Sequence, residues 1–202
     1  MAGLDTLLVR PMEEEIRENL GEKTLQKIEK RLFERHGMNL AQSIQKFHLL
    51  DSVLREFFGD GAEGLERQVF KKVMMVEKLQ AEERSWTMLE NSSLVKTILE
   101  TLASEDNSQI INSVRSVSKT ITEISDECKI SSKQVCTMVD SLVKNGILTT
   151  SNDSTQDESI EEKYISVFED INIVIKENSV KIKVKMSAAS VKTSSLVQVC
   201  MV

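Results

Sequence analysis

Apolar residues recur at helical spacing from Glu13 to Gln80. The pattern predicts three amphipathic helices. The first ends at Gly37, the second runs over 39–59 with Asn39 as its N-cap, and the third runs over 62–80. The inward face of the first helix carries Leu25, Ile28, Leu32 and Phe33. A helical unit of roughly 70 residues is near the lower limit for a self-supporting core, so we expect it to pack against a partner.

Helical spacing is interrupted at residues 81–91, which are polar and only weakly periodic. This stretch predicts a joint between two units, with the single tryptophan, Trp86, as a packing anchor. A helix capped by Asn91 or Ser92 and a shorter one from about Ser108 are expected next, before an extended stretch over 117–120. The inward positions of these two helices are Leu94, Val95, Ile98, Leu99 and Leu102, then Ile110, Ile111 and Val114.

Residues 120–146 have the spacing of a helix-turn-helix. A short helix over 120–128 is followed by a three-residue turn centred on Ile130 and by a second helix from Ser132 to Asn145-Gly146. We expect the two helices to be held together by Ile124, Ile130, Val135, Val139 and Leu142. The opposite face of the second helix is polar and free to meet a partner; it carries Ser132, Lys133, Gln134, Thr137, Asp140, Ser141 and Lys144.

Beyond Gly146 the pattern changes from helical to alternating, which indicates β-strands. A short strand over 147–150 is followed by an acidic loop over 151–162 and by an amphipathic hairpin that turns at Asn178-Ser179. A helix-turn-helix followed by a β element is the arrangement of a winged helix.

The predicted fold is therefore mainly α with a small antiparallel β element. It divides into an N-terminal helical domain with its joint over 1–90, a winged helix-turn-helix domain over 91–186, and a tail over 187–202. The pattern of the tail fits either a final helix or a docking strand.

Composition narrows the class of protein. The chain has 202 residues, of which 40% are hydrophobic and 29% charged, as in soluble globular proteins. No segment approaches the ~18 apolar residues of a membrane span, and the N-terminal apolar run is too short for a signal peptide. Three cysteines without a C-x-x-C pair argue against a disulfide scaffold and favour a reducing cytosol. We therefore expect a cytoplasmic protein with no membrane partner.

Charge gives no general indication of a nucleic-acid partner, because 32 acidic and 26 basic side chains leave a net charge of -6. The densest basic feature is the ladder of Lys181, Lys183 and Lys185 in the predicted hairpin. We interpret it as a solvated strand face that discourages edge aggregation, with contact to DNA or an acidic partner as the alternative.

The stretch from about Ser92 to Met186 resembles archaeal winged-helix regulators of the ArsR-like helix-turn-helix class. The resemblance is carried by Lys119–Ser125, Leu142–Leu148 and Lys163–Phe168, the last an aromatic-led strand. The helical half is similar to a small output domain of regulators from ammonia-oxidising archaea, through residues 16–25, 50–59 and 64–67. The first resemblance implies DNA binding.

Two features depart from the pattern of such regulators. Their recognition helix commonly carries a Tyr-Arg pair where this chain has Cys136-Thr137, so an arginine contact to phosphate or to a base edge is missing. The loop over 151–162, which should form the wing, holds acidic residues and no basic one, and phosphate would repel it. Lys129, Lys133 and Lys144 remain to contact DNA, together with Lys119 and Arg115.

The sequence gives little support to a dinucleotide-binding, metal-binding or catalytic site. Residues 59–64 match G-x-G-x-x-G but follow a predicted helix instead of a strand, so we interpret them as an inter-helix turn. His36 and His48 lie far from the cysteines, and Cys128 with Cys136 supplies no tetrahedral ligand set, so small half-buried thiols are expected. No catalytic arrangement or phosphate loop is found, so neither an enzyme nor a cofactor or metal is predicted.

The sequence thus predicts a transcription regulator that binds double-stranded DNA with the second helix of its helix-turn-helix in the major groove. The predicted DNA-binding residues are Ser132, Lys133, Gln134, Thr137 and Lys144. The N-terminal helical domain is expected to serve in homodimerisation, sensing or contact with a protein partner. The alternatives are a non-catalytic protein-interaction module with a degenerate winged helix and, less favoured, an effector-binding sensor.

Overall fold

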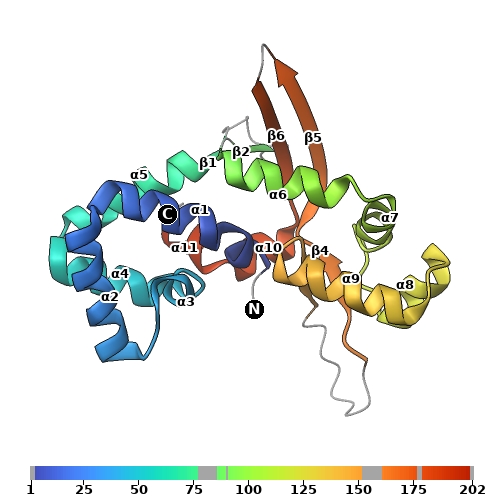
Figure 1. Ribbon diagram of the computed structural model, residues 1–202, viewed down its shortest axis with the longest axis horizontal. Helices are drawn as coiled ribbons and strands as arrows, with labels where there is room; N and C mark the ends of the chain where they lie inside the picture. Colours follow the sequence, from blue (N-terminus) through green and yellow to red (C-terminus); the bar gives the residue numbers. More distant parts are fainter. Residues whose placement is uncertain (1–2, 77–85, 90, 152–160, 177–178, 201–202) are drawn as a thin grey trace.

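Helices dominate the computed structural model, which describes residues 3–76, 86–89, 91–151, 161–176 and 179–200 (Figure 1). The helices are α1 (Gly3–Leu20), α2 (Glu22–His36), α3 (Leu40–Ile44), α4 (Phe47–Phe58), α5 (Gly61–Val73), α6 (Ser92–Leu102), α7 (Glu105–Ser113), α8 (Ile121–Cys128), α9 (Ser132–Lys144), α10 (Ala188–Thr193) and α11 (Ser195–Cys200). The strands are β1 (Met74–Val76), β2 (Trp86–Leu89), β3 (Leu148–Thr150), β4 (Tyr164–Ser166), β5 (Phe168–Lys176) and β6 (Ser179–Met186). The predicted fold class, mainly α with a small antiparallel β element, is confirmed.

The N-terminal half begins with two helices where one was predicted. Gly21, with φ 69°, separates α1 from α2, because this left-handed backbone conformation ends a helix and suits glycine. On α2 the predicted residues Leu25, Ile28 and Leu32 are buried, but Phe33 is 70% exposed. One further residue turns the side chain by about 100°, which takes Phe33 off the buried stripe.

The next two predicted helices also differ from the structure. Asn39 caps a helix as predicted, with Gln42 completing a capping box, but the helix breaks at Gln45 and Lys46 into α3 and α4. The helix predicted over 62–80 ends at Val73 in α5, and the chain continues as strand β1. The backbone N–H and C=O groups of β1 pair with β2, so they find hydrogen-bond partners without continuing the helix. The predicted end of this helix, residues 77–80, lies outside the described residues.

Most of the strands form one antiparallel sheet in the order β1-β2-β6-β5. Strand β2, inside the predicted polar joint, pairs with β6 from Trp86↔Lys185 to Leu89↔Ile182. The joint is therefore partly a strand, in which Thr87 and Leu89 are buried and Trp86 is half-buried. The sheet joins residues on both sides of the predicted boundary near residue 90.

The second half follows the predicted order closely. Asn91 caps α6, whose Leu94, Val95 and Ile98 are buried, and α7 begins at Glu105 because Ser104 caps it there. Helices α8 and α9 are followed by the small antiparallel pair β3 and β4 and by the β5/β6 hairpin. No described helix is long and apolar enough to cross a membrane.

Helix α1 and the tail tie the two halves together. The tail, for which the sequence left helix and strand open, forms α10 and α11, which contact α1, α4 and α5. The N-terminus of α1 packs on the winged-helix half so closely that a Cβ on Gly3 would lie 2.7 Å from Cγ2 of Val167. One hydrophobic core therefore runs through both halves.

Candidate nucleic-acid interface

A set of local hydrogen bonds fixes the helix-turn-helix. Thr120 caps α8 in a capping box with Glu123, and the pKa of the Glu123 carboxyl is lowered, mainly by the backbone N–H of Thr120. Lys129, with φ 56°, ends α8. The hydroxyl of Ser125 then donates to the carbonyl oxygen of Ile130 at 2.7 Å, which holds the turn against α8. The predicted turn centred on Ile130 is confirmed.

The core of this motif matches the prediction. Ile124, Val135, Val139 and Leu142 are buried between α8, α9 and their neighbours, and Ile130 packs partly buried against them. Because Val135, Val139 and Leu142 recur on one side of α9, the opposite side of the helix faces outward.

The five predicted DNA-binding residues all lie exposed on α9: Ser132, Lys133, Gln134, Thr137 and Lys144. Lys133, Thr137 and Lys144 are spaced at i, i+4 and i+11, which places them in one stripe along the helix. Asp140 lies in the same stripe and is also exposed. The stripe therefore carries two lysines and one carboxylate.

Side chains at the start of α9 are held by short contacts. The hydroxyl of Ser131 donates to Oε1 of Gln134 at 2.6 Å, and that of Ser132 donates to the hydroxyl of Ser125 at 3.1 Å. Thr137 donates its hydroxyl to the carbonyl oxygen of Lys133 at 3.1 Å. These contacts leave the amide nitrogen of Gln134 available as a donor at the N-terminal end of the stripe.

The hairpin of β3 and β4 stands where a wing is expected. It continues through a hydrogen bond from the Ser151 N–H to the carbonyl oxygen of Lys163, and Lys119 forms a β-bridge with Tyr164 on its other side. Of the acidic loop predicted over 151–162, residues 152–160 lie outside the described residues.

The described base of the wing is acidic. Glu161 accepts a hydrogen bond from the hydroxyl of Thr122, and Glu162 accepts one from the phenol of Tyr164 at 2.9 Å. Burial raises the pKa of Tyr164 to about 12, with further contributions from Glu162 and from the charge of Asp140. The tyrosine therefore stays a neutral donor to Glu162 at physiological pH.

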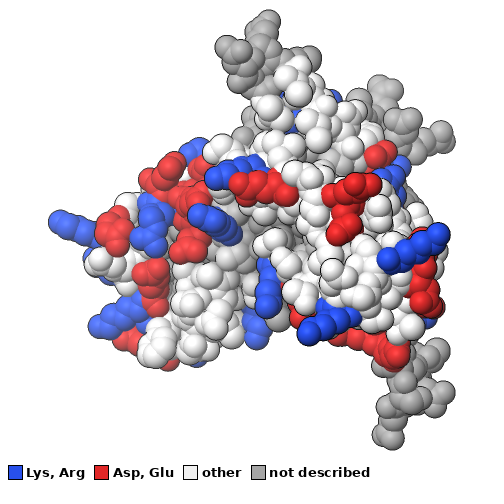
Figure 2. Space-filling model, turned by 45° about the vertical axis from the view of Figure 1, so that its right-hand side comes forward, with Lys and Arg blue, Asp and Glu red and all other residues white. Residues whose placement is uncertain are grey.

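Basic side chains near the helix-turn-helix are few. Lys119 forms an ion pair with Glu127, and Arg115 donates to Oδ1 of Asn112 at 2.7 Å. Lys133 and Lys144 form no ion pair with another described residue. Figure 2 shows acidic and basic side chains interspersed over the face in view. The electrostatic attraction of this region for phosphate therefore depends on individual lysines.

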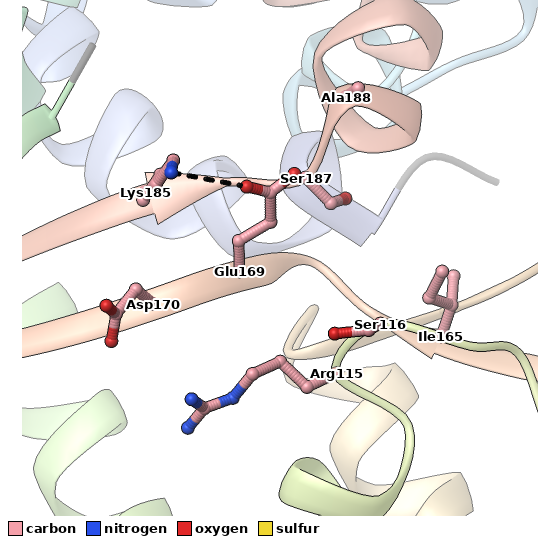
Figure 3. A pocket seen from close by; sticks show the side chains of 8 residues that line it. All are labelled: Arg115, Ser116, Ile165, Glu169, Asp170, Lys185, Ser187 and Ala188. Carbon is pink, nitrogen blue, oxygen red and sulfur yellow. Dashed lines mark ion pairs between the residues drawn. The ribbon is translucent and has the colours of Figure 1, made fainter. Parts of the chain in front are cut away.

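A polar pocket of about 520 Å³ lies between the winged helix and the base of the β5/β6 hairpin (Figure 3). Its lining residues are Arg115, Ser116, Ile165, Glu169, Asp170, Lys185, Ser187 and Ala188. Lys185 pairs with Glu169 at 3.8 Å across the two strands. None of the five predicted DNA-binding residues lines the pocket, which the sequence did not reveal because its walls come from segments some 70 residues apart.

The glycine-rich segment and the cysteines lie as follows in the structure. Gly59, with φ 56°, ends α4, so the G-x-G-x-x-G segment begins as the predicted inter-helix turn, although Gly61 and Gly64 lie within α5. Cys128 is half-buried as expected, but Cys136 is exposed because it lies on the outward side of α9. Among the described residues no group of three or more His, Cys, Asp or Glu is placed to hold a metal ion.

Comparisons of the chain with protein-family models, with curated proteins and with solved structures gave no match.

Proposed function

We propose that the protein is a DNA-binding transcription regulator that inserts α9 into the major groove. The observation that carries this proposal is the polar stripe of α9, because a helix that is fully exposed on one side and fixed by a buried core on the other can enter a groove without rearrangement. The hairpin β3/β4 follows α9 directly, in the position from which a wing contacts the DNA backbone.

Each predicted residue has a role in this proposal. Lys133 and Lys144 neutralise phosphates, which supplies affinity without sequence preference. Gln134 is suited to read adenine, since its amide both donates and accepts hydrogen bonds at a base edge, and contact would require exchange of its bond with Ser131. Ser132 and Thr137 add hydroxyl contacts to phosphate or to bases.

Fluorescence anisotropy with promoter fragments at low salt tests the proposal. The wild-type chain should bind, and Gln134→Ala should reduce discrimination between fragments while changing affinity for non-specific DNA little. Lys30→Ala, whose side chain on α2 is 78% exposed, serves as a control and should bind as the wild type does. Failure of the wild type to bind, or binding unaffected by changes on α9, would reject the proposal.

A second candidate function is a protein-interaction module on the same winged helix. The specific observation that favours it is a set of carboxylates, Asp140 within the polar stripe of α9 and Glu161 and Glu162 at the base of the wing. These would meet a basic partner surface better than phosphate. Capture of a partner on the immobilised chain that survives nuclease treatment, and is lost on Asp140→Lys, would support this function over DNA binding.

The N-terminal helices fit a role in sensing within a cytoplasmic regulator. Support for sensing would be a rise in the melting temperature with a metabolite or a metal ion, because a ligand that binds only the folded chain stabilises it.

A further inference from the structure

The β5/β6 hairpin projects from the body of the molecule as an arm (Figure 1). Its strands pair from Phe168↔Met186 to Lys176↔Ser179, whereas β2 covers β6 only between Ile182 and Lys185. The outer part of the arm therefore has no neighbouring strand on either side among the described residues.

One face of the arm is apolar along its whole length. Ile171, Ile173 and Ile175 on β5 lie opposite Val184, Ile182 and Val180 on β6. Val184 and Ile182 are completely buried at the inner end, but Ile173 is 43%, Val180 40% and Ile175 76% exposed. The apolar surface thus continues outward past the point where the body of the protein covers it.

Strand β5 is also a free edge of the sheet, since the strand order ends with it. Natural edge strands are usually protected by proline, by inward charges, by a bulge or by shortness. Within β5 as the structure describes it, the strand has an irregularity between Phe168 and Asp170, and beyond it residues 171–175 read Ile-Asn-Ile-Val-Ile without a charge or a proline. Such an edge is suited to accept another strand.

We propose that a second copy of this chain occupies the edge, with the two β5 strands antiparallel about a two-fold axis at Ile173. The regular edge runs from Asp170, after the bulge, to residue 176 at the end of β5, and its midpoint is residue 173. Pairing centred there uses the full edge of both copies. The two sheets would join into one, continuous through β6-β5-β5-β6.

This register is self-complementary in polarity. Residues directly opposite each other in an antiparallel pair lie on the same face, so Ile173 meets its own copy and Ile171 meets Ile175. The apolar faces of the two arms are then continuous. Asp170 lies opposite residue 176, at the end of the paired strands and outside the apolar row.

Centring the pair one residue away from Ile173 is less favourable. With the axis at Asn172 the pairing would place Asp170 opposite Val174, and with the axis at Val174 it would leave Asp170 without an opposite residue in the strand. A strand of an unrelated protein would gain the backbone hydrogen bonds but not the matched row of isoleucines. These differences single out a second copy in the 173-centred register.

Sedimentation equilibrium of the full chain tests the interface without DNA, so its outcome is independent of the proposed function. The wild type should be a dimer and Ile173→Lys a monomer with unchanged circular dichroism, because the axis would bring two lysines together. The control Phe33→Lys makes the same kind of change at a 70% exposed site on α2 and should remain dimeric. A monomeric wild type, or dimers that persist in Ile173→Lys or dissociate in Phe33→Lys, would overturn the proposal.

Oxidative crosslinking provides a readout that does not depend on the lysine variant folding. In a chain carrying Cys128→Ser, Cys136→Ser and Cys200→Ser, Ile173→Cys should form a disulfide-linked dimer rapidly, because opposite Cα atoms in an antiparallel pair lie about 4.5–5.5 Å apart. Val180→Cys, of similar exposure but on β6, should crosslink at least tenfold more slowly. Equal rates at the two sites, or no crosslink at residue 173, would exclude this register.

Discussion

The carboxylate of Asp5 accepts hydrogen bonds from both the backbone N–H and the hydroxyl of Ser195, each at 2.8 Å. Ser194 also donates its hydroxyl to Asp5, and the Ser195 hydroxyl accepts the N–H of Phe47. Asp5 is 2% exposed. One carboxylate therefore joins the start of α1 to the start of α11 and, through Ser195, to α4.

Replacing Asp5 by alanine should destabilise the fold by about 2–3 kcal/mol, because it removes charge-assisted hydrogen bonds and leaves the buried hydroxyl and N–H groups of the tail without an acceptor. Urea unfolding measures the loss. Asp60→Ala is the control, since Asp60 is exposed and makes no capping hydrogen bond, and it should stay within about 0.5 kcal/mol of the wild type. Equal effects of the two changes would show that the tail is not held by Asp5.

Glycine at position 146 should be indispensable for packing α1 on the winged helix. Gly146 has φ 71°, and a Cβ there would lie 2.4 Å from the backbone nitrogen of Leu7. We expect Gly146→Ala to lower the free energy of unfolding by more than about 2 kcal/mol, from backbone strain together with displacement of α1.

Gly64→Ala is the opposite case and serves as its control. Gly64 lies inside α5 with open space around the position of a Cβ. Alanine there should stabilise the protein by about 0.5–1 kcal/mol, because it restricts the unfolded chain and favours the helix. Thermal unfolding of both variants checks the pair, and a tolerated alanine at position 146 would contradict the close contact with α1.

Buried Glu66 should make stability fall with rising pH. Its side chain is 3% exposed, Oε1 has no hydrogen-bond partner among the described residues, and apolar neighbours such as Phe47 and Val69 line the small cavity beside it. Burial raises the pKa of Glu66 from 4.5 to about 8, with the nearby carboxylate of Asp51 adding to the shift and Arg55 opposing it.

The sign of this effect follows from the raised pKa. Below pH 4.5 the carboxyl is protonated in both states and costs nothing, whereas between pH 4.5 and about 8 the unfolded chain ionises and the folded chain does not. We expect Glu66→Gln to be increasingly more stable than the wild type as pH rises from 5 to 8, in urea unfolding at each pH. A constant difference across that range would show that Glu66 is ionised in the folded protein.

Much of the fold could be predicted from local pattern. The helix-turn-helix could be predicted, because Ile124, Val135, Val139 and Leu142 recur at helical spacing and Gly146 ends α9. Two features could not be predicted in this way: the break between α3 and α4, and the strands β1 and β2. They depend on partners distant in sequence, such as β6 for Trp86.

At the candidate sites, too, the sequence did not predict the features that depend on contacts between distant residues. The polar stripe of α9 was predictable because one helix supplies it. The pocket around Arg115 and Lys185, and the bonds of Asp5 to residues some 190 positions away, are formed by segments that are distant in the sequence. No local signal in the sequence marks such pairs.

The acidic base of the wing should weaken DNA binding. Replacing both Glu161 and Glu162 by glutamine removes two negative charges and should tighten binding several-fold at low salt, because phosphate no longer meets fixed carboxylates. Glu18→Gln, an exposed change on α1, is the matched control and should have no effect. Unchanged affinity of the wing variant in anisotropy titrations would indicate that the wing stays away from DNA.

The salt dependence of DNA affinity tests the central claim, that α9 carries the DNA contact, most directly. Anisotropy titrations across a series of salt concentrations give the slope of log K against log salt, and each lost phosphate contact should reduce its magnitude by about 1. We expect a slope reduced by about 2 for Lys133→Ala combined with Lys144→Ala, and an unchanged slope for Lys30→Ala. Absence of DNA binding at low salt, or the same slope in the wild type and the double variant, would contradict it.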